Sequence, residues 1–285
     1  MPSAQSETPQ PPVITLPSDG RPNRRSAEYD QYFRLCRAEQ ELSRDTGDCL
    51  SVQDAVLSDL PASDLDGRER ADLLAGLALL NRRLLREWLT RAPGLAGNRP
   101  PASQPAQPAP ADSTTALYRW KLGHQLFHLH LRAMNDTLIQ ATDAARESRW
   151  PQLSGLLQEL RVLYDAATAA MSYSAALHPD AYQGEVRPTM EPPFLSPGFS
   201  GLFNQEHRQT VRLLRRLRTT LEDRLDDADC GLPDHVRSLI GELAAAQARN
   251  HANHVQICHR FVPEGASLLR RHLEARRDGC PGREG

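Results

Sequence analysis

The sequence lacks the short motifs of the common cysteine-based sites. Its five cysteines are widely spaced, without a CxxC pair or a CxxCH stretch, so ordinary zinc sites and the usual CxxCH cofactor attachment are excluded. No apolar run is long enough to span a bilayer, and residues 1–27 are polar and proline-rich, unlike a secretory signal. The sequence therefore predicts a cytoplasmic protein with no membrane partner.

Aromatic residues and an excess of charge of one sign are also scarce. Phe, Trp and Tyr make up 5% of the 285 residues, and the formal net charge is −2. Such a weak overall field gives no reason to expect a nucleic-acid partner. Leu, Ala and Arg abound while β-branched residues are few, so the composition predicts an all-α fold.

The hydrophobic pattern indicates one helical domain between two tails. We predict disordered tails over residues 1–26 and 278–285, and a single all-α domain over 27–277. Prolines predict a Pro/Ala-rich loop over 93–113 and a second long loop over 179–197. Apolar residues at helical spacing predict helices over 29–42, 66–90, 114–147, 150–176, 200–226, 233–261 and, as a short closing helix, 265–274.

The helix expected at 233–261 carries an imidazole and a thiol one turn apart. Residues 254–258 read HVQIC, which places His254 and Cys258 at i and i+4 on one face. An imidazole is a good iron ligand, and a cysteine can form a thioether to a haem vinyl group. The stripe of this helix begins apolar and turns polar halfway, which indicates that its second half faces a ligand. His251, one turn earlier, is an alternative iron ligand, but its i+4 neighbour Val255 cannot form a thioether.

A second group of histidines lies on the helix expected at 114–147, where His124 and His128 share a face. His124 falls on the apolar stripe with Trp120, and a buried imidazole needs a partner. Two histidine-bearing helices could also build a zinc or di-iron site, but HExxH is absent. No Glu stands three residues before His124 or before either candidate histidine of the later helix, so the sequence gives that alternative little support. His130 is interpreted as a surface or hydrogen-bonded side chain.

Four segments carry a family resemblance when they are read in order. Residues 29–35 read YDQYFRL, Trp120 precedes His124-Gln125 by four residues, residues 200–208 read SGLFNQEHR, and His254-Val255 closes the series. They resemble the Tyr-x-x-Tyr-Leu-x-Leu, distal Phe-x-x-x-His-Gln, Ser-Gly-Phe-Gln-Ser-x-Gln-Phe-Arg and iron-ligating His of the tryptophan 2,3-dioxygenase-like superfamily of haem proteins. The dioxygenases' Gly-Thr-Gly-Gly stretch is missing. The His-x-x-x-Cys spacing is instead similar to the haem-dependent L-tyrosine hydroxylase branch.

The resemblance implies a helical bundle with haem between the His124 helix and the His254 helix. His254 would ligate the iron, a single thioether would link the haem to Cys258, and His124 would move protons in the distal pocket. The implied reaction is hydroxylation of L-tyrosine or a methyl-tyrosine to a catechol, with hydrogen peroxide as oxidant, in natural-product biosynthesis.

The resemblance also implies residues that bind the substrate. Arg208 would hold the amino-acid carboxylate in a two-pronged pair, and Asn204 and Trp120 would line the same pocket. Tyr29 would reach the pocket of a neighbouring subunit in a homodimer or larger assembly, unless it simply packs its own helix.

Two other functions remain open from the sequence. A tryptophan- or indole-type haem oxygenase could share the scaffold. A haem-free helical interaction protein could use the Arg-rich helices as a docking face and the Pro/Ala-rich segment as a linker.

Overall fold

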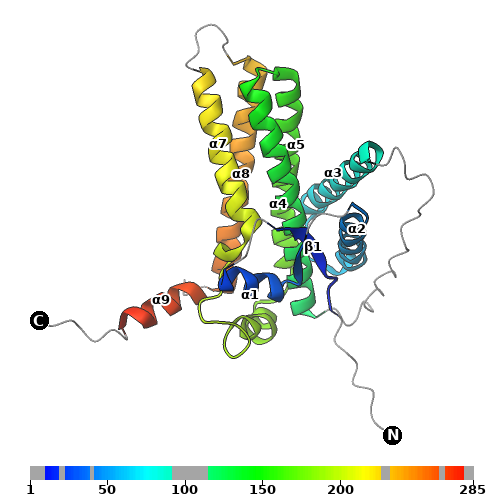
Figure 1. Ribbon diagram of the computed structural model, residues 1–285. Coiled ribbons are helices and arrows are strands. Elements are labelled where there is room, and N and C mark those ends of the chain that lie inside the picture. Colours follow the sequence, from blue (N-terminus) through cyan, green and yellow to red (C-terminus); the bar gives the residue numbers. More distant parts are fainter. Residues whose placement is uncertain are drawn as a thin grey trace, which may run out of the picture.

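The computed structural model describes residues 10–18, 23–38, 42–91, 115–225, 232–262 and 267–278. These residues form helices and a single two-stranded sheet, so the all-α prediction is confirmed (Figure 1). Within these ranges, no helix combines the length and the apolar character that crossing a bilayer requires.

Four long helices stand side by side and form the main body (Figure 1). They are α4 (Ala116–Arg146), α5 (Trp150–Ser174), α7 (Gln205–Leu225) and α8 (Asp234–Phe261). α4 packs against both α5 and α7, whereas α8 packs mainly against α5. The α4–α5 contact is close because Gly123 has no side chain: a Cβ there would lie 2.4 Å from the Cβ of Ser174.

Two further helices cover one side of this body. α2 (Leu42–Asp59) contacts α4, and α3 (Gly67–Arg91) contacts α5. Asp59 joins three helices, because it pairs with Arg119 of α4 at 2.7 Å and accepts a hydrogen bond from the Tyr173 hydroxyl of α5 at 2.7 Å. α3 confirms the helix predicted at 66–90, while α2 was not predicted.

The N-terminal segment differs from its prediction. β1 (Ile14–Pro17) pairs in parallel with β2 (Leu35–Ala38), and α1 (Arg24–Tyr32) connects them. The disordered tail predicted over 1–26 is therefore wrong for residues 10–17 and 23–26, because Ile14 and Leu16 are buried in the core. The helix predicted over 29–42 is wrong after Tyr32, because Arg34 adopts a left-handed backbone (φ 57°) that ends the helix and turns the chain into β2.

The other predicted elements can be placed on the structure. α4, α5 and α8 confirm the helices predicted at 114–147, 150–176 and 233–261 within a few residues, and α9 (Leu268–Asp278) extends the short closing helix. α7 starts at Gln205 instead of 200, after the short helix η5 (Gly201–Phe203). The loop predicted over 179–197 contains α6 (Pro179–Ala181), η3 (Tyr182–Val186) and η4 (Arg187–Met190), and η1 (Leu60–Ala62) follows α2. The loop predicted over 93–113 and residues 279–285 lie outside the described residues.

Candidate functional site

The C-terminal half of α8 presents an imidazole and a thiol on one exposed face. The Nε2 atom of His254 lies 3.7 Å from the Sγ atom of Cys258, and both side chains are exposed. Desolvation by surrounding side chains, and then the charge of His251, lower the pKa of His254. The i, i+4 spacing therefore places the two groups together, as predicted from the sequence.

Not all polar side chains in the C-terminal half of α8 face outward. Asn250 donates to Thr168 Oγ1 at 2.9 Å, and Asn253 donates to Ser172 Oγ at 3.2 Å, so these two side chains bind α5. His254 lies eleven residues after the buried Leu243 and therefore on the same face of α8, but its imidazole is exposed. The His254–Cys258 face of this half remains open to a ligand.

His124 is enclosed by aromatic rings on α4 and in the turn after α1. Its ring stacks on Phe33 (centroids 4.4 Å apart, planes 12° apart) and lies 4.3 Å from the ring of Trp120. Its Nδ1 lies 2.7 Å from the Trp120 carbonyl oxygen. A carbonyl only accepts, so Nδ1 carries the hydrogen and Nε2 is left as an acceptor.

The electrostatics place His124 and His254 near each other. Burial, assisted by the charges of His128 and His254, lowers the pKa of His124 to about 3. The imidazole is therefore neutral at pH 7. Because His254 belongs to α8 and contributes to this shift, the bundle brings the two predicted histidines within electrostatic range across the helices.

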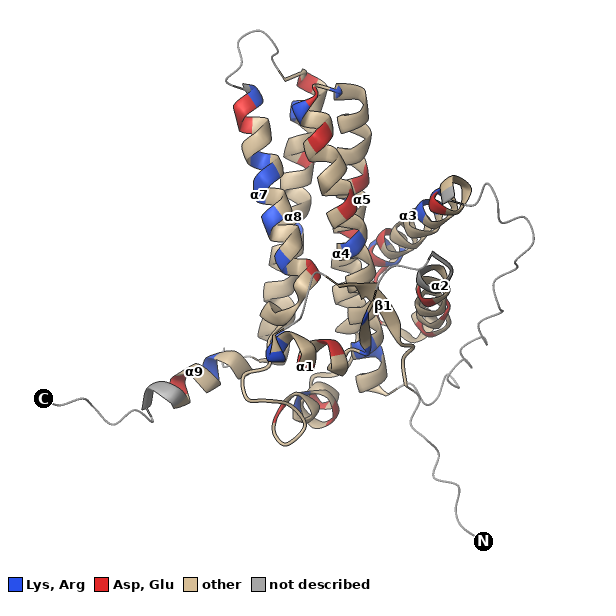
Figure 2. Cartoon of the chain, in the orientation of Figure 1, with Lys and Arg blue, Asp and Glu red and all other residues tan. Residues whose placement is uncertain are grey.

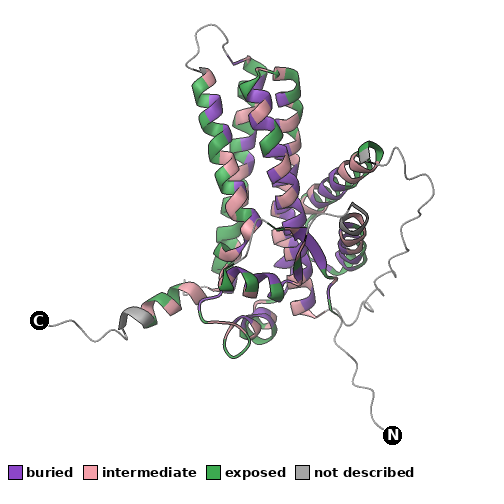
Figure 3. Ribbon diagram, viewed as in Figure 1, coloured by how far each residue is buried: buried purple, intermediate pink, exposed green. Residues whose placement is uncertain are grey.

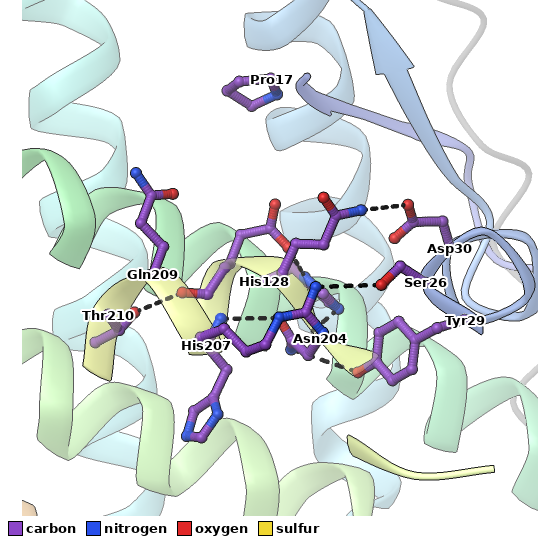
Figure 4. A network of polar contacts seen from close by, with 12 residues as sticks. Pro17, Ser26, Tyr29, Asp30, His128, Asn204, His207, Gln209 and Thr210 are labelled. Carbon is purple, nitrogen blue, oxygen red and sulfur yellow. Dashed lines mark hydrogen bonds and ion pairs between the residues drawn. The ribbon is translucent and has the colours of Figure 1, made fainter. Parts of the chain in front are cut away.

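A buried network of polar and charged groups surrounds the start of α7 (Figure 4). Glu206 of α7 pairs with His128 Nδ1 at 2.9 Å and with Arg37 of β2, and Arg37 also pairs with Asp30 of α1 at 2.7 Å. Burial acts to raise the pKa of Glu206, but the hydrogen bonds from His128 and Arg37 outweigh it and hold this pKa well below its ordinary value. The network therefore joins the N-terminal segment to α4 and α7 through a permanent carboxylate.

Asn204 connects this network to the start of α7. Its side-chain oxygen accepts a hydrogen bond from the His207 backbone N–H at 2.9 Å, which caps the helix. Its amide nitrogen lies 3.4 Å from both the Tyr29 hydroxyl and His128 Nε2. Tyr29 and Asn204, two residues predicted to bind substrate, are thus in contact, and Tyr29 is buried within its own chain.

Arg208 lies at the edge of this region. Its guanidinium donates to the Leu202 carbonyl oxygen at 2.8 Å and to the Ser26 hydroxyl at 3.2 Å. These bonds hold its position relative to α1. The role as a carboxylate clamp stays a prediction.

Sequence reasoning missed several residues of this region. His128, Glu206 and Arg37 form the buried network, and His207 points away from it in Figure 4. Burial and then the charge of His254 lower the pKa of His207, so a third imidazole lies near the α8 face. The shared face of His124 and His128 was the available signal for His128.

Comparison with known protein families gives one match. The sequence pattern of the SfmD 3-methyl-L-tyrosine peroxygenase family matches residues 2–253. The chain belongs to this family. The match ends one residue before His254, so the His-x-x-x-Cys face lies just beyond the matched segment.

Two individual relatives show how far the similarity reaches. A 3-methyl-L-tyrosine peroxygenase of Streptomyces lavendulae is 26% identical over 171 residues, which are 59% of this chain and 45% of that protein. The chain thus matches less than half the length of this relative. The crystal structure of reduced SfmD, soaked with sodium hydrosulfite, is similar with a TM-score of 0.55 and 21% identity, covering 86% of this chain and 78% of that one. This likeness supports the helical fold.

Proposed function

We propose that this chain is a haem-dependent peroxygenase that hydroxylates L-tyrosine or a methyl-tyrosine next to the phenol oxygen. One oxygen atom of hydrogen peroxide would enter the ring C–H bond to give a catechol, and the other would leave as water. Membership of the SfmD family supports this class of reaction. The observation that carries the proposal is the 3.7 Å separation of His254 Nε2 and Cys258 Sγ on an exposed face of α8.

The residues present fit a haem. His254 would ligate the iron through Nε2, and Cys258 lies on the same face for a thioether to a vinyl group. His251 is also exposed on α8 and is the alternative ligand. When bound, the haem would supply activation of the peroxide O–O bond.

His124 would handle the proton. Its Nε2 carries a lone pair, because Nδ1 donates its hydrogen to the Trp120 carbonyl. It can therefore accept a proton from peroxide or from the phenol. The pKa of about 3 means that the imidazole holds this proton weakly and readily returns it to a departing oxygen.

Of the other predicted substrate residues, one contacts His124 and the others would form more distant parts of the pocket. Trp120 borders His124 directly, at 4.3 Å between ring centroids. Tyr29 and Asn204 lie deeper and are joined to each other, so they would shape the wall of the pocket. Arg208, which is partly exposed, would meet the amino-acid carboxylate at the edge.

A spectrum and a product assay test the proposal together. The chain, expressed with adequate haem supply, is given hydrogen peroxide with L-tyrosine, 3-methyl-L-tyrosine or L-tryptophan in parallel. We expect a Soret band and a product heavier by one oxygen atom from a tyrosine, and none when oxygen and a reductant replace peroxide. An oxidised indole product would favour the tryptophan-type oxygenase, and a colourless protein would favour the haem-free interaction protein. Either result would overturn the proposal.

A further inference from the structure

The turn after α1, which carries Arg34, contacts the first turns of α4, which carry Lys121. The Nε atom of Arg34 is buried and has no hydrogen-bond partner. The ammonium nitrogen of Lys121 lies 4.6 Å from the centroid of the Tyr32 ring. Within the described part of the chain, neither cation has a carboxylate within ion-pair distance.

Two partly buried charges of the same sign are unfavourable near each other, and the contact of Lys121 with the Tyr32 ring offsets this only in part. Burial, and then the charge of Arg34, lower the pKa of Lys121, and no carboxylate of the described residues offsets them. Arg34 also adopts a left-handed backbone (φ 57°), which costs free energy for a residue with a side chain. Arg37, three residues later, shows the usual solution, because it pairs with Asp30 and Glu206.

Both cations belong to segments that border His124. Arg34 directly follows Phe33, whose ring stacks on the His124 imidazole at 4.4 Å. Lys121 precedes His124 by three residues on α4 and therefore lies one turn away. The Trp120 indole, which also borders His124, interacts with the Tyr32 hydroxyl. The buried Nε of Arg34 is thus left as a donor without an acceptor, and buried donors normally have partners.

We propose that Arg34 and Lys121 form a binding subsite for a carboxylate group beside His124. A guanidinium and an ammonium provide charge-assisted donors for both carboxylate oxygens. The inference rests on the proposed function, which supplies two sources of this chemistry: the carboxylate of the amino-acid substrate and a propionate of the haem. Arg208 is the competing residue for the substrate, but its guanidinium already binds Leu202 and Ser26.

Tyramine, which is tyrosine without its carboxylate, provides the test. The full-length, haem-loaded chain is compared with the double variant Arg34→Gln/Lys121→Met by kcat/KM for L-tyrosine and for tyramine, by haem content, and by calorimetric binding of L-tyrosine. Arg34→Lys/Lys121→Arg keeps both charges and controls for packing. Arg82→Gln on α3 is exposed and controls for the loss of positive charge.

If the subsite binds the substrate, the double variant lowers the preference for L-tyrosine over tyramine by about tenfold or more, while haem content stays normal. If it binds a propionate, the variant loses haem and keeps its preference. Both results support the subsite, and the charge-preserving variant should restore most of either property. Unchanged preference, haem content and tyrosine binding in the double variant would overturn it, most clearly if Arg208→Gln alone abolished the preference.

Different measurements would contradict the carboxylate subsite and the proposed hydroxylase function. If the wild-type chain makes no catechol, calorimetry still reports on the subsite. A wild-type chain that binds L-tyrosine about tenfold more tightly than the double variant, but forms no product, would keep the carboxylate site and remove the hydroxylase.

Discussion

The helices α4 and α8 have similar lengths, 31 and 28 residues, but very different surroundings. α4 is buried along most of its length, because α5 and α7 cover it on two sides. α8 buries only Val236, Leu243, Ala246 and Phe261 among its described side chains (Figure 3). A helix that is left uncovered over half its length has room for a ligand, whereas a covered helix can only position groups toward one.

The histidines of α4 and α8 differ in exposure in the same way as the helices that carry them. His124 and His128 of α4 are enclosed, with fixed partners in Trp120 and Glu206. His254 of α8 is exposed and has Cys258 as its neighbour. The covered helix therefore holds its imidazoles in fixed orientations, and the open helix presents the groups that would bind the cofactor.

Charge is distributed unevenly as well. Lys and Arg gather along α7 in Figure 2. Four arginines of that helix and Arg146 of α4 surround a surface hollow of about 570 Å³ at the end remote from Asn204. The buried network at the start of α7 has the opposite composition, because Glu206 and Asp30 face one arginine.

The largest expected effect is the loss of haem from His254→Ala. Removing the imidazole removes the proposed iron ligand from the open helix, so we expect no stable haem incorporation and no activity. The pyridine haemochrome assay measures bound haem. His259→Ala, one residue past Cys258 and exposed, should retain normal haem. A normal haem content in His254→Ala, with loss in His251→Ala, would move the ligand by one turn.

Two side-chain truncations to alanine compare the packing of α4 and α8. Leu126 of α4 is fully buried, so Leu126→Ala should lower the free energy of unfolding by about 2–5 kcal/mol. Val255 of α8 is 39% exposed, so Val255→Ala should change it by less than about 0.5 kcal/mol in the cofactor-free chain. Urea unfolding followed by circular dichroism measures both. Equal losses would mean that α8 is covered as well as α4.

His130 provides a smaller, pH-dependent effect on α4. It is buried beside Gly76, and neither ring nitrogen has a hydrogen-bond partner. The expectation of a surface or hydrogen-bonded side chain is therefore wrong. Replacing an unpaired buried imidazole by an apolar side chain of similar size, His130→Leu, should leave stability at pH 7.5 unchanged or raise it by about 1 kcal/mol.

Lowering the pH should make the cost of burying His130 measurable. Burial lowers the pKa of His130 to about 3, whereas the unfolded chain has the ordinary value near 6.5. The unfolded state therefore binds more protons between these values, and stability falls as pH decreases from 6.5 toward 3. At pH 5 this group should cost the wild type about 2 kcal/mol, a loss that His130→Leu avoids. Urea unfolding from pH 5 to 7.5 checks this, and identical pH dependence in both proteins would contradict it.

Apolar periodicity predicted the long helices because each buries a stripe of its own residues. α3, α4, α5 and α8 lie within a few residues of their predicted bounds. The strands could not be predicted this way, because β1 and β2 are stabilised by pairing Ile14 with Leu35, which are distant in sequence. The end of α1 was also missed, because it depends on the left-handed conformation of Arg34.

The site shows the same division between local and distant contacts. His254 and Cys258 were predicted together because four residues make one helical turn. The partner of His128 was not, because Glu206 lies 78 residues away on another helix. Asn204 was expected in the substrate pocket, but its contacts with His207, Tyr29 and His128 also make it the cap of α7.

The proposed function depends most on a thioether that would join Cys258 to a haem, one helical turn from His254. The most direct measurement is the intact mass of the purified chain under denaturing conditions, with Cys258→Ser as the matched variant. We predict that the wild type gains the mass of one haem and that the variant, although still coloured before denaturation, gains none. A wild-type chain with the unmodified mass would contradict the tether, and an equal gain in Cys258→Ser would assign it to another residue.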